Sequence, residues 1–476
     1  MVIKERLRKL ADAKEARREK ILNEPLFPLL IKTSLPTMVG MMVTLIYNLT
    51  DTFCIGFLGN KSMTAAIGIV FSFISFIQAL GFWFGYGSGN KMSRLLGAKQ
   101  EEEARKVAAC GVFLAVISSV VIVLLCFAFK RPLIRALGGN ASDSLNHYVD
   151  SYLTVMLLAV PFTLYAFTVY NQIRLCGNVK DAMIGILAGM LTNIILDPVF
   201  IYGFKMEVAG AGVATLIGHM LSTFVLIRLM HMHGNIPAHF SEAKFTKERL
   251  YNILVGGAPN FSRQSITSIA SIILNSIASG YGEALVAAFT VATRIISLGN
   301  MLMIGFGQGF QPICAMNYGA GKFDRVKKAL NITVIIGSVF LLISTILIAV
   351  YAVPLSALLS SNEDVIMLSA KIVRFQCLSL PVMAVFALSS MFLQNVGRYF
   401  PALFISVSRQ GFVFLPLLFI LNTAYGEFGL YILQPVADII STAFAVVLVY
   451  VFWNKVFPNQ KTKRYPEAIT KSYSKR

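Results

Sequence analysis

Twelve long apolar segments follow one another along the chain, separated by short stretches rich in charged residues, Gly, Pro and Asn. A helix needs about 20 predominantly apolar residues to cross the hydrocarbon core of a membrane, and each segment is long enough. The segments cover approximately residues 28–55, 62–87, 107–129, 147–172, 182–202, 208–231, 250–279, 284–310, 329–352, 368–393, 402–422 and 428–453. This pattern predicts an all-α polytopic membrane protein with twelve transmembrane helices.

The composition argues against a soluble enzyme and against a nucleic-acid-binding protein. Hydrophobic residues make up 56% of the chain and charged residues only 14%, whereas about a quarter of a soluble domain is charged. The formal net charge of +19 comes mainly from the tails and polar connections, not from aromatic-rich basic stripes. The six cysteines lie singly, without metal-ligand spacing, so we expect buried free thiols and no cofactor.

The basic residues predict the orientation of the chain in the membrane. If successive connections alternate between the two faces, the face with both termini carries most of the Lys and Arg residues. The connections on the other face hold Lys61, Lys130, Arg131, Arg135 and Lys205. Because basic residues concentrate on the cytoplasmic side, both termini are expected in the cytoplasm.

The two halves of the chain repeat one sequence pattern. Residues 61–106 align with residues 283–328 in a single register. The alignment matches Ala65-Ala66 with Ala287-Ala288, Gly85-x-Gly87 with Gly307-x-Gly309, and Gly97-Ala98 with Gly319-Ala320. A parallel repeat of this kind predicts two six-helix lobes related by an axis along the membrane normal, in a V around a central cleft. The expected parts are an N-terminal tail at 1–27, an N-lobe at 28–231, a linker at 232–249, a C-lobe at 250–453 and a C-terminal tail at 454–476.

Two acidic residues lie within apolar segments of the first half, where an ionisable group is costly and is a functional candidate. Asp51 lies in NLTDTFCIG near the end of the first segment, and Asp197 lies in NIILDPVF near the end of the fifth. Asn193 shares a helix face with Asp197, and Pro198 frees carbonyl oxygens there. These groups form a hard-oxygen site suited to Na⁺ or to a shared proton. Alternatively, each Asp is an interface residue whose carboxylate binds water.

The second half carries a different polar set. Arg263 and Gln264 lie in the seventh segment, Arg294 in the eighth, Arg409 in the eleventh and Asp438 in the twelfth. Cations inside a membrane must pair or face water, and Asp438 is the acid available to them. Either Asp438 and an arginine form a fixed structural pair, or Asp438 exchanges partners between two states of the lobe. Arg263 and Gln264 are also candidates for contact with a substrate.

Tyr47 lies one turn before Asp51 on the same helix face and is a candidate for lining the cleft. Flexible Met and flat aromatic side chains accept varied amphiphiles. Acidic groups and aromatic faces both favour positive charge. We therefore expect small, lipophilic organic cations as substrates.

From residue 25 to residue 455 the chain resembles the MATE (multidrug and toxic compound extrusion) family of secondary transporters. The resemblance rests on NLTDTFCIGFLG, NIILDPVFIYG, GVATLIG at 212–218, and AAFTVATRI followed by IGFGQGFQPICAMNYGAGK. It implies a cation site in the N-lobe formed by Asp51, Asn193, Asp197 and Thr215. Thr215 enters this set only through the resemblance.

The leading hypothesis is a Na⁺- or H⁺-coupled antiporter that exports lipophilic, mostly cationic compounds by alternating access. The alternative is a lipid-linked saccharide flippase of the same superfamily, which would hold a pyrophosphate with arginines such as Arg263 and Arg294. The acids Asp51 and Asp197 argue against it. A membrane enzyme lacks support because neither HExxH nor GxSxG occurs, and a channel lacks a filter-like loop. The resemblance implies a multi-pass monomer in a bacterial inner or plasma membrane, surrounded by lipid.

Overall fold

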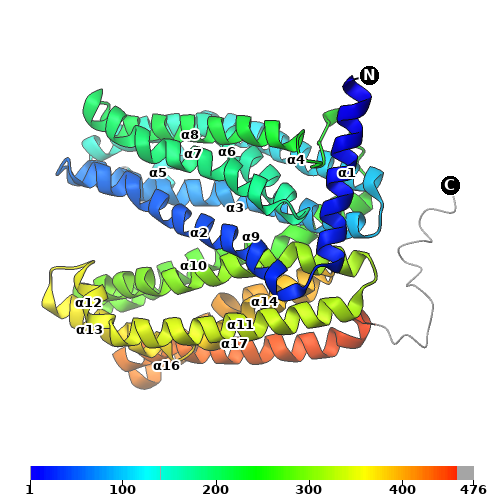
Figure 1. The fold of residues 1–476 in the computed structure, drawn as a ribbon. Helices are drawn as coiled ribbons and strands as arrows, with labels where there is room; N and C mark the ends of the chain where they lie inside the picture. Colours follow the sequence, from blue (N-terminus) through cyan, green and yellow to red (C-terminus); the bar gives the residue numbers. More distant parts are fainter. Residues whose placement is uncertain (1, 140, 458–476) are drawn as a thin grey trace.

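The computed structural model of the protein describes residues 2–139 and 141–457 (Figure 1), so most of the predicted C-terminal tail lies outside the described residues. All regular elements of the described chain are helical. In chain order they are α1 (Val2–Asn23), α2 (Leu26–Gly56), α3 (Lys61–Gly97), α4 (Glu101–Ala128), α5 (Lys130–Ala136), α6 (Asp143–Leu175), α7 (Val179–Pro198), η1 (Val199–Gly203), α8 (Glu207–Met230), η2 (Phe240–Glu242), α9 (Lys247–Ala278), η3 (Ser279–Tyr281), α10 (Glu283–Gly319), α11 (Phe323–Val350), α12 (Ala352–Ala357), α13 (Glu363–Cys377), η4 (Leu380–Val382), α14 (Met383–Asn395), α15 (Tyr399–Ser408), η5 (Arg409–Val413), α16 (Phe414–Tyr425) and α17 (Glu427–Val456).

The all-α membrane architecture is confirmed. Within the described chain, 10 helical segments are long and apolar enough to span a membrane, and α13 and α14 add one more if this pair, bent by 46°, is a single broken span. The remaining long helix, α9, has 32 residues but a more polar sequence. Its polar side chains face a cavity described below. The exact number of twelve membrane crossings stays a prediction.

The helices form two lobes with matching order. The starts of α6 and α13, of α7 and α15, and of α8 and α17 are each 220 residues apart. Figure 1 shows α3, α6, α7 and α8 in one group and α10, α11, α16 and α17 in the other. The two groups meet near α1 and diverge toward the opposite end. The predicted V of two repeated halves is therefore confirmed.

The repeated glycine pairs mark the places where the lobes touch. A Cβ atom on Gly97 would lie 2.1 Å from the Met316 carbonyl oxygen, and one on Gly319 would lie 2.0 Å from the Arg94 carbonyl oxygen. The ends of α3 and α10 therefore approach so closely that only Gly fits. The repeated Gly-Ala motifs form this reciprocal contact between the halves.

The first long helix of each half packs against the opposite half. On α2, Ser34 donates a hydrogen bond of 3.0 Å to the Phe306 carbonyl of α10, and Gly309 of α10 leaves room for Ser34. On α9, Ile253 packs against Gly87 of α3 in the same way. Each glycine is the second of its repeated Gly-x-Gly motif, so the motif serves contact between the lobes.

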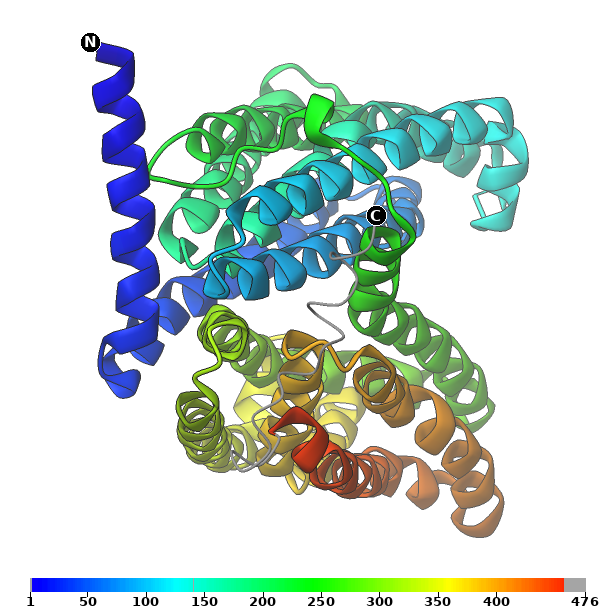
Figure 2. The same ribbon diagram turned by 90° about the vertical axis from the view of Figure 1, so that its right-hand side faces the viewer.

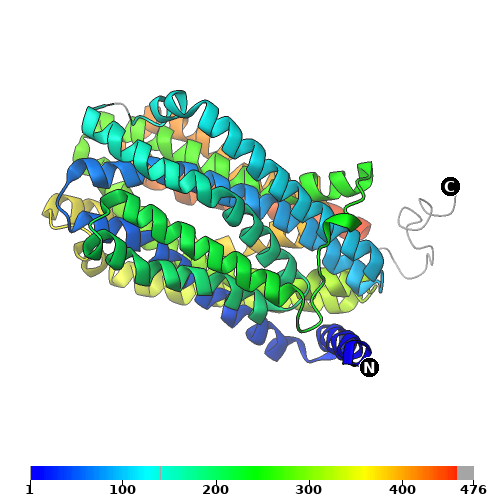
Figure 3. The same cartoon turned by 90° about the horizontal axis from the view of Figure 1, so that it is seen from above.

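Helix α1 runs across the end at which the lobes meet. Figure 2 shows it alongside both lobes, and Figure 3 shows it almost end-on beside the bundle. Arg18 donates to the carbonyls of Leu96 and Gly97 in the N-lobe. At the other end of α1, Asn317 of the C-lobe donates 3.1 Å to the Ile21 carbonyl. The helix therefore joins the two lobes like a strap.

Two arginines, one fully buried and one half-buried, also join the lobes near α1. Arg174 of α6 is fully buried and donates to the Gln308 carbonyl at 2.8 Å and to Oε1 of Gln311 at 2.9 Å, both on α10. Arg94 of α3 donates to the Asn395 carbonyl at 2.7 Å. Charge-assisted hydrogen bonds are strong, so this end of the molecule is closed.

Candidate functional site

The N-lobe brings together the two acids that the sequence singled out. Asp51 is near the end of α2, and Asp197 is the second-last residue of α7. The two carboxyl groups lie close enough to influence each other electrostatically. Tyr152 of α6 donates a hydrogen bond of 3.2 Å to Oδ2 of Asp51. Three helices thus meet at one pair of acids.

Asn193 links the acid pair to α8. Its Nδ2 atom donates to Oδ1 of Asp197 at 3.3 Å and to Oγ1 of Thr215 at 3.0 Å. Asn193, Asp197 and Thr215 are all buried. The structure therefore places the four residues of the predicted cation site next to one another.

Three side-chain oxygens of this cluster have no hydrogen-bond partner among the described residues. They are Oδ1 of Asp51, Oδ1 of Asn193 and Oδ2 of Asp197, all buried. An unpaired buried oxygen is costly, and two adjacent carboxylates repel each other unless a cation or a proton is shared between them. Hard oxygen ligands of this kind suit a small cation. The residues present fit a bound Na⁺ or a shared proton.

The helix changes its geometry directly after the acid. Pro198 ends α7, and η1 follows as one turn of π-helix, in which the Phe204 amide donates to the Val199 carbonyl at 3.0 Å. Proline lacks the N–H that would continue the α-helical ladder, and π-turns are frequent at functional sites. Asp197 thus lies at a junction where the backbone can repack locally.

A close contact between α7 and α8 holds the cluster together. A Cβ on Gly189 would lie 2.2 Å from the Gly218 carbonyl oxygen, so the two helices touch along their backbones. A small cavity of about 10 Å³ beside this contact is lined in part by Tyr47, Asn193 and Thr215. Tyr47 is buried in the N-lobe core and does not line the larger cavity of the C-lobe. Its helix face turns toward α7 and α8, and its predicted role in lining the cleft stays a prediction.

The C-lobe has an ion pair in place of an acid pair. Nε of Arg409 donates to Oδ1 of Asp438 at 2.7 Å, and its NH2 group lies 3.4 Å from Oδ2. Ser379 and Gln434 also donate to this carboxylate, at 2.8 Å and 2.6 Å. Asp438 is buried, with 2% of its side chain exposed. These four donor contacts agree with a structural pair, and the partner-exchange interpretation stays untested.

A cavity of about 300 Å³ adjoins this pair inside the C-lobe. Arg263 and Gln264 of α9 line it, together with Arg409 and Asp438. The predicted member Arg294 is exposed on α10 and does not line the cavity. No hydrogen bond or ion pair links its side chain to Asp438 or Arg409 among the described residues.

Sequence reasoning missed three partners of the acids. Tyr152 and Ser379 contact acids that are remote in sequence, so no local pattern reveals them. Gln434 precedes Asp438 by four residues, as Asn193 precedes Asp197. This shared amide-to-acid spacing was a usable signal for Gln434.

Comparisons with known proteins agree with this geometry. A sequence profile of the MatE family matches residues 36–199 and 259–420, one stretch in each lobe. The chain belongs to the MatE family. The resemblance to MATE transporters inferred from the motifs is thereby confirmed.

Similar MATE relatives and structures cover nearly the whole chain. "Multidrug export protein MepA" of Staphylococcus aureus (strain MSSA476) is 27% identical over 436 residues, covering 91% of this chain and 95% of that protein. A crystal structure of MATE in the straight conformation superposes with a TM-score of 0.86 at 23% identity, covering 92% and 98%. A MOP superfamily transporter from Pyrococcus furiosus, described as having a binding pocket of reverse polarity, gives 0.84 at 25% identity, covering 92% and 97%.

Proposed function

We propose that this MATE protein exports lipophilic compounds by antiport, driven by Na⁺ or H⁺ taken up at Asp51 and Asp197. The observation that carries the proposal is that these two carboxyl groups are close neighbours, and that each keeps one buried oxygen without a hydrogen-bond partner among the described residues. The export of drugs is supported by the relatives named as multidrug export proteins. These relatives are transporters, and the site is explained without a catalytic role for its residues.

The coupling follows from the repulsion between the acids. With both carboxylates ionised the pair is strained, and a bound Na⁺ or proton relieves the strain. Helix α2 and the Pro198–η1 junction can then repack, because the acids lie on these two elements. Ion and substrate can exclude each other through one two-state element even if they never touch.

Topology completes the proposal. The basic residues near the closed end, including those of α1, support a cytoplasmic position of this end and of both termini by the positive-inside rule. The cleft then opens to the outside of a bacterial plasma membrane. The protein acts as a monomer in the bilayer, with a substrate pathway between its own two lobes.

The flippase alternative loses support from the arginines. It needs several free arginines around a pyrophosphate, but Arg409 is paired with Asp438 and Arg294 is outside the cavity. Organic cations were the expected substrates because of the N-lobe acids. Those acids are enclosed in the N-lobe, so in this proposal they serve coupling, and the preferred charge of the substrate is a separate question.

Efflux of ethidium, a lipophilic cation, from vesicles that contain the purified protein tests the function. We expect an inwardly directed Na⁺ gradient or proton gradient, imposed separately, to accelerate efflux, with protein-free vesicles as the control. Efflux that responds to neither gradient would contradict antiport. A response to one gradient alone identifies the coupling ion.

A further inference from the structure

The cavity of the C-lobe holds one more positive than negative charge. Its charged lining residues are Arg263, Arg409 and Asp438. Arg409 and Asp438 neutralise each other through their ion pair. Arg263 forms no ion pair with any residue that the structure describes, and Arg409 lines the same cavity. A guanidinium at this depth needs a counter-charge or water.

Asp438 is not available as that counter-charge, nor for the amine of a cationic substrate. Its two oxygens already accept hydrogen bonds from Arg409, Ser379 and Gln434. A cation that entered the cavity would have to displace these donors while facing Arg263. The electrostatics of this cavity therefore disfavour cations and favour an anion.

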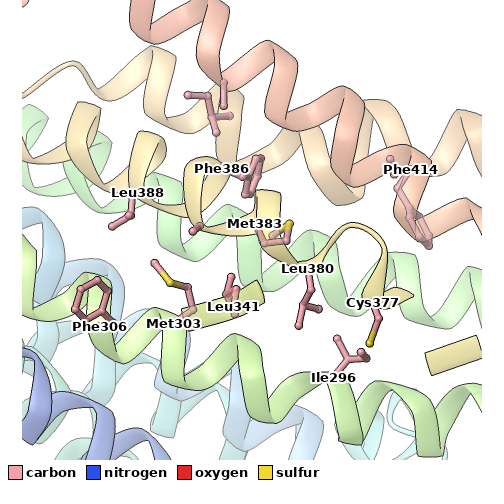
Figure 4. Close-up of a cluster of buried hydrophobic side chains, with 14 of the residues drawn as sticks. Ile296, Met303, Phe306, Leu341, Cys377, Leu380, Met383, Phe386, Leu388 and Phe414 are labelled. Atoms are coloured by element: carbon pink, nitrogen blue, oxygen red, sulfur yellow. The ribbon is translucent and has the colours of Figure 1, made fainter. Parts of the chain in front are cut away.

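The rest of the cavity wall is suited to an amphiphile. Several side chains offer amide groups next to Arg263, among them Asn260, Gln264 and Gln410. The opposite part of the wall is apolar, formed by Ile296, Met303, Leu380, Met383, Phe386 and Phe414. Figure 4 shows these apolar side chains, with those of α10 on one side and those of η4 and α14 on the other. Flexible Met side chains adapt to ligands of different shape.

Among the residues that the structure describes, the corresponding place in the N-lobe is much narrower, with a cavity of only about 10 Å³. At the positions 220 residues before Arg409 and Asp438 the N-lobe has Gly189 and Gly218, whose backbones are in contact. In the C-lobe, the long side chains of the ion pair stand between α15 and α17, and a turn of π-helix begins at Arg409. The C-lobe is therefore open at the place where the N-lobe is closed.

We propose that the C-lobe cavity binds the anionic head group of a lipophilic substrate, such as a carboxylate, with Arg263 as its counter-ion. The apolar wall holds the body of the substrate. A volume of about 300 Å³ is within the range of small-molecule sites. This inference rests on the export function proposed above and specifies its substrate class.

The test compares two dyes that differ only at the group in question. Tetramethylrhodamine carries a free carboxylate, and its methyl ester is a cation of the same shape. Binding of each dye to the full-length purified protein in a neutral detergent is measured by fluorescence anisotropy, without any ion gradient. We expect the free acid to bind more tightly, and Arg263→Gln to weaken its binding about tenfold or more while leaving the ester unchanged.

Two further variants make the result specific. Arg263→Lys keeps the charge and should keep most of the preference for the free acid. Arg294→Gln removes a charge from the same lobe outside the cavity and should change neither dye. The proposal is overturned if the wild type binds the ester as tightly as the acid, or if Arg263→Gln and Arg294→Gln weaken acid binding equally.

An anionic lipid could supply the same chemistry, so phosphatidylglycerol is added in a parallel titration. If the lipid excludes the free acid at equal concentration, the anion of the cavity is a lipid phosphate and the substrate assignment fails. Failure of the export proposal gives a different result. If that proposal is wrong, a gradient drives efflux of neither dye, although both still bind. If only this inference is wrong, the ester is still exported, but binding shows no preference for the free acid that depends on Arg263.

Discussion

Asp438 accepts a two-pronged ion pair from Arg409 at 2.7 Å and 3.4 Å, at the positions where the N-lobe has a glycine–glycine contact. The two lobes share helix order, but differ at this crossing of their fifth and sixth helices. In the N-lobe the two helices are in contact there, near the two acids. In the C-lobe the two helices are separated there, and arginines lie in the space between them. In the proposed account, the two pseudo-symmetric halves therefore have different roles, with ion coupling in the N-lobe and substrate contact in the C-lobe.

Replacing Asp438 by Asn should destabilise the protein, because it leaves the Arg409 charge without a partner. Breaking a buried ion pair costs roughly 3–5 kcal/mol, and the partial exposure of Arg409 to the cavity, 21% of its side chain, reduces this to about 2–3 kcal/mol. The midpoint of thermal unfolding in detergent should fall by several degrees.

Asp150→Asn is the matched control. Asp150 forms an ion pair with Lys130, but its side chain is 47% exposed. Such a pair contributes under about 1 kcal/mol to stability. Adding Arg409→Gln to Asp438→Asn should restore part of the lost stability. An unchanged midpoint of thermal unfolding in Asp438→Asn would show that the ion pair does not stabilise the protein.

Gly189→Ala should disturb the cation site without touching its ligands. The new Cβ would lie 2.1 Å from Oγ of Ser222 and 2.2 Å from the Gly218 carbonyl, so α7 and α8 must separate and the Asn193–Thr215 hydrogen bond must lengthen. Overpacking of this kind costs about 1–3 kcal/mol. Thermal unfolding and ion-driven efflux should both decline. Gly68→Ala is the control, because no atom lies within 4 Å of its added Cβ, and equal behaviour of the two variants would refute the close contact.

Arg174→Gln should loosen the closed end, because its guanidinium holds α6 to α10 through two bonds. Cys176 reports this opening. It lies in the turn after α6, where burial raises the pKa of its thiol, and maleimide reacts with the thiolate. Labelling of Cys176, followed by peptide mass spectrometry, should therefore be slow in the wild type at neutral pH and faster in the variant.

Arg228→Gln serves as the control, because Arg228 is exposed on α8 and takes no part in the contact between the lobes. Labelling of Cys176 at the same rate in all three proteins would mean that Arg174 does not keep this end closed.

Much of the fold could be predicted because a membrane imposes simple rules. Apolar segments that cross a membrane must be helices, because a helix satisfies the hydrogen bonds of its own backbone. The Gly-x-Gly and Gly-Ala motifs showed that the two halves of the chain repeat. The structure adds the reason for these motifs, which is close backbone contact between the lobes. The apolar segment predicted at 250–279 corresponds to α9, which is less apolar than the other long spans because its polar residues line the cavity.

The candidate site divides in the same way. Asn193 and Asp197 could be predicted because their spacing of four residues puts them on one helix face. Tyr152 could not, because its contact with Asp51 depends on how α2 packs on α6. The position of Arg294 outside the polar network was also beyond sequence reasoning, since helix rotation is set by packing with neighbouring helices.

The most direct test of the account is gradient-driven efflux by Asp197→Asn. The substitution keeps the size of the side chain and an oxygen that can accept the bond from Asn193, but it removes the charge that would bind Na⁺ or a proton. We predict that the variant inserts and folds, binds substrate, and loses the efflux that an imposed Na⁺ or proton gradient drives in the wild type. Asp51→Asn should behave in the same way. If both variants pump at the wild-type rate and Asp438→Asn alone is inactive, the coupling site lies in the C-lobe and the account is contradicted.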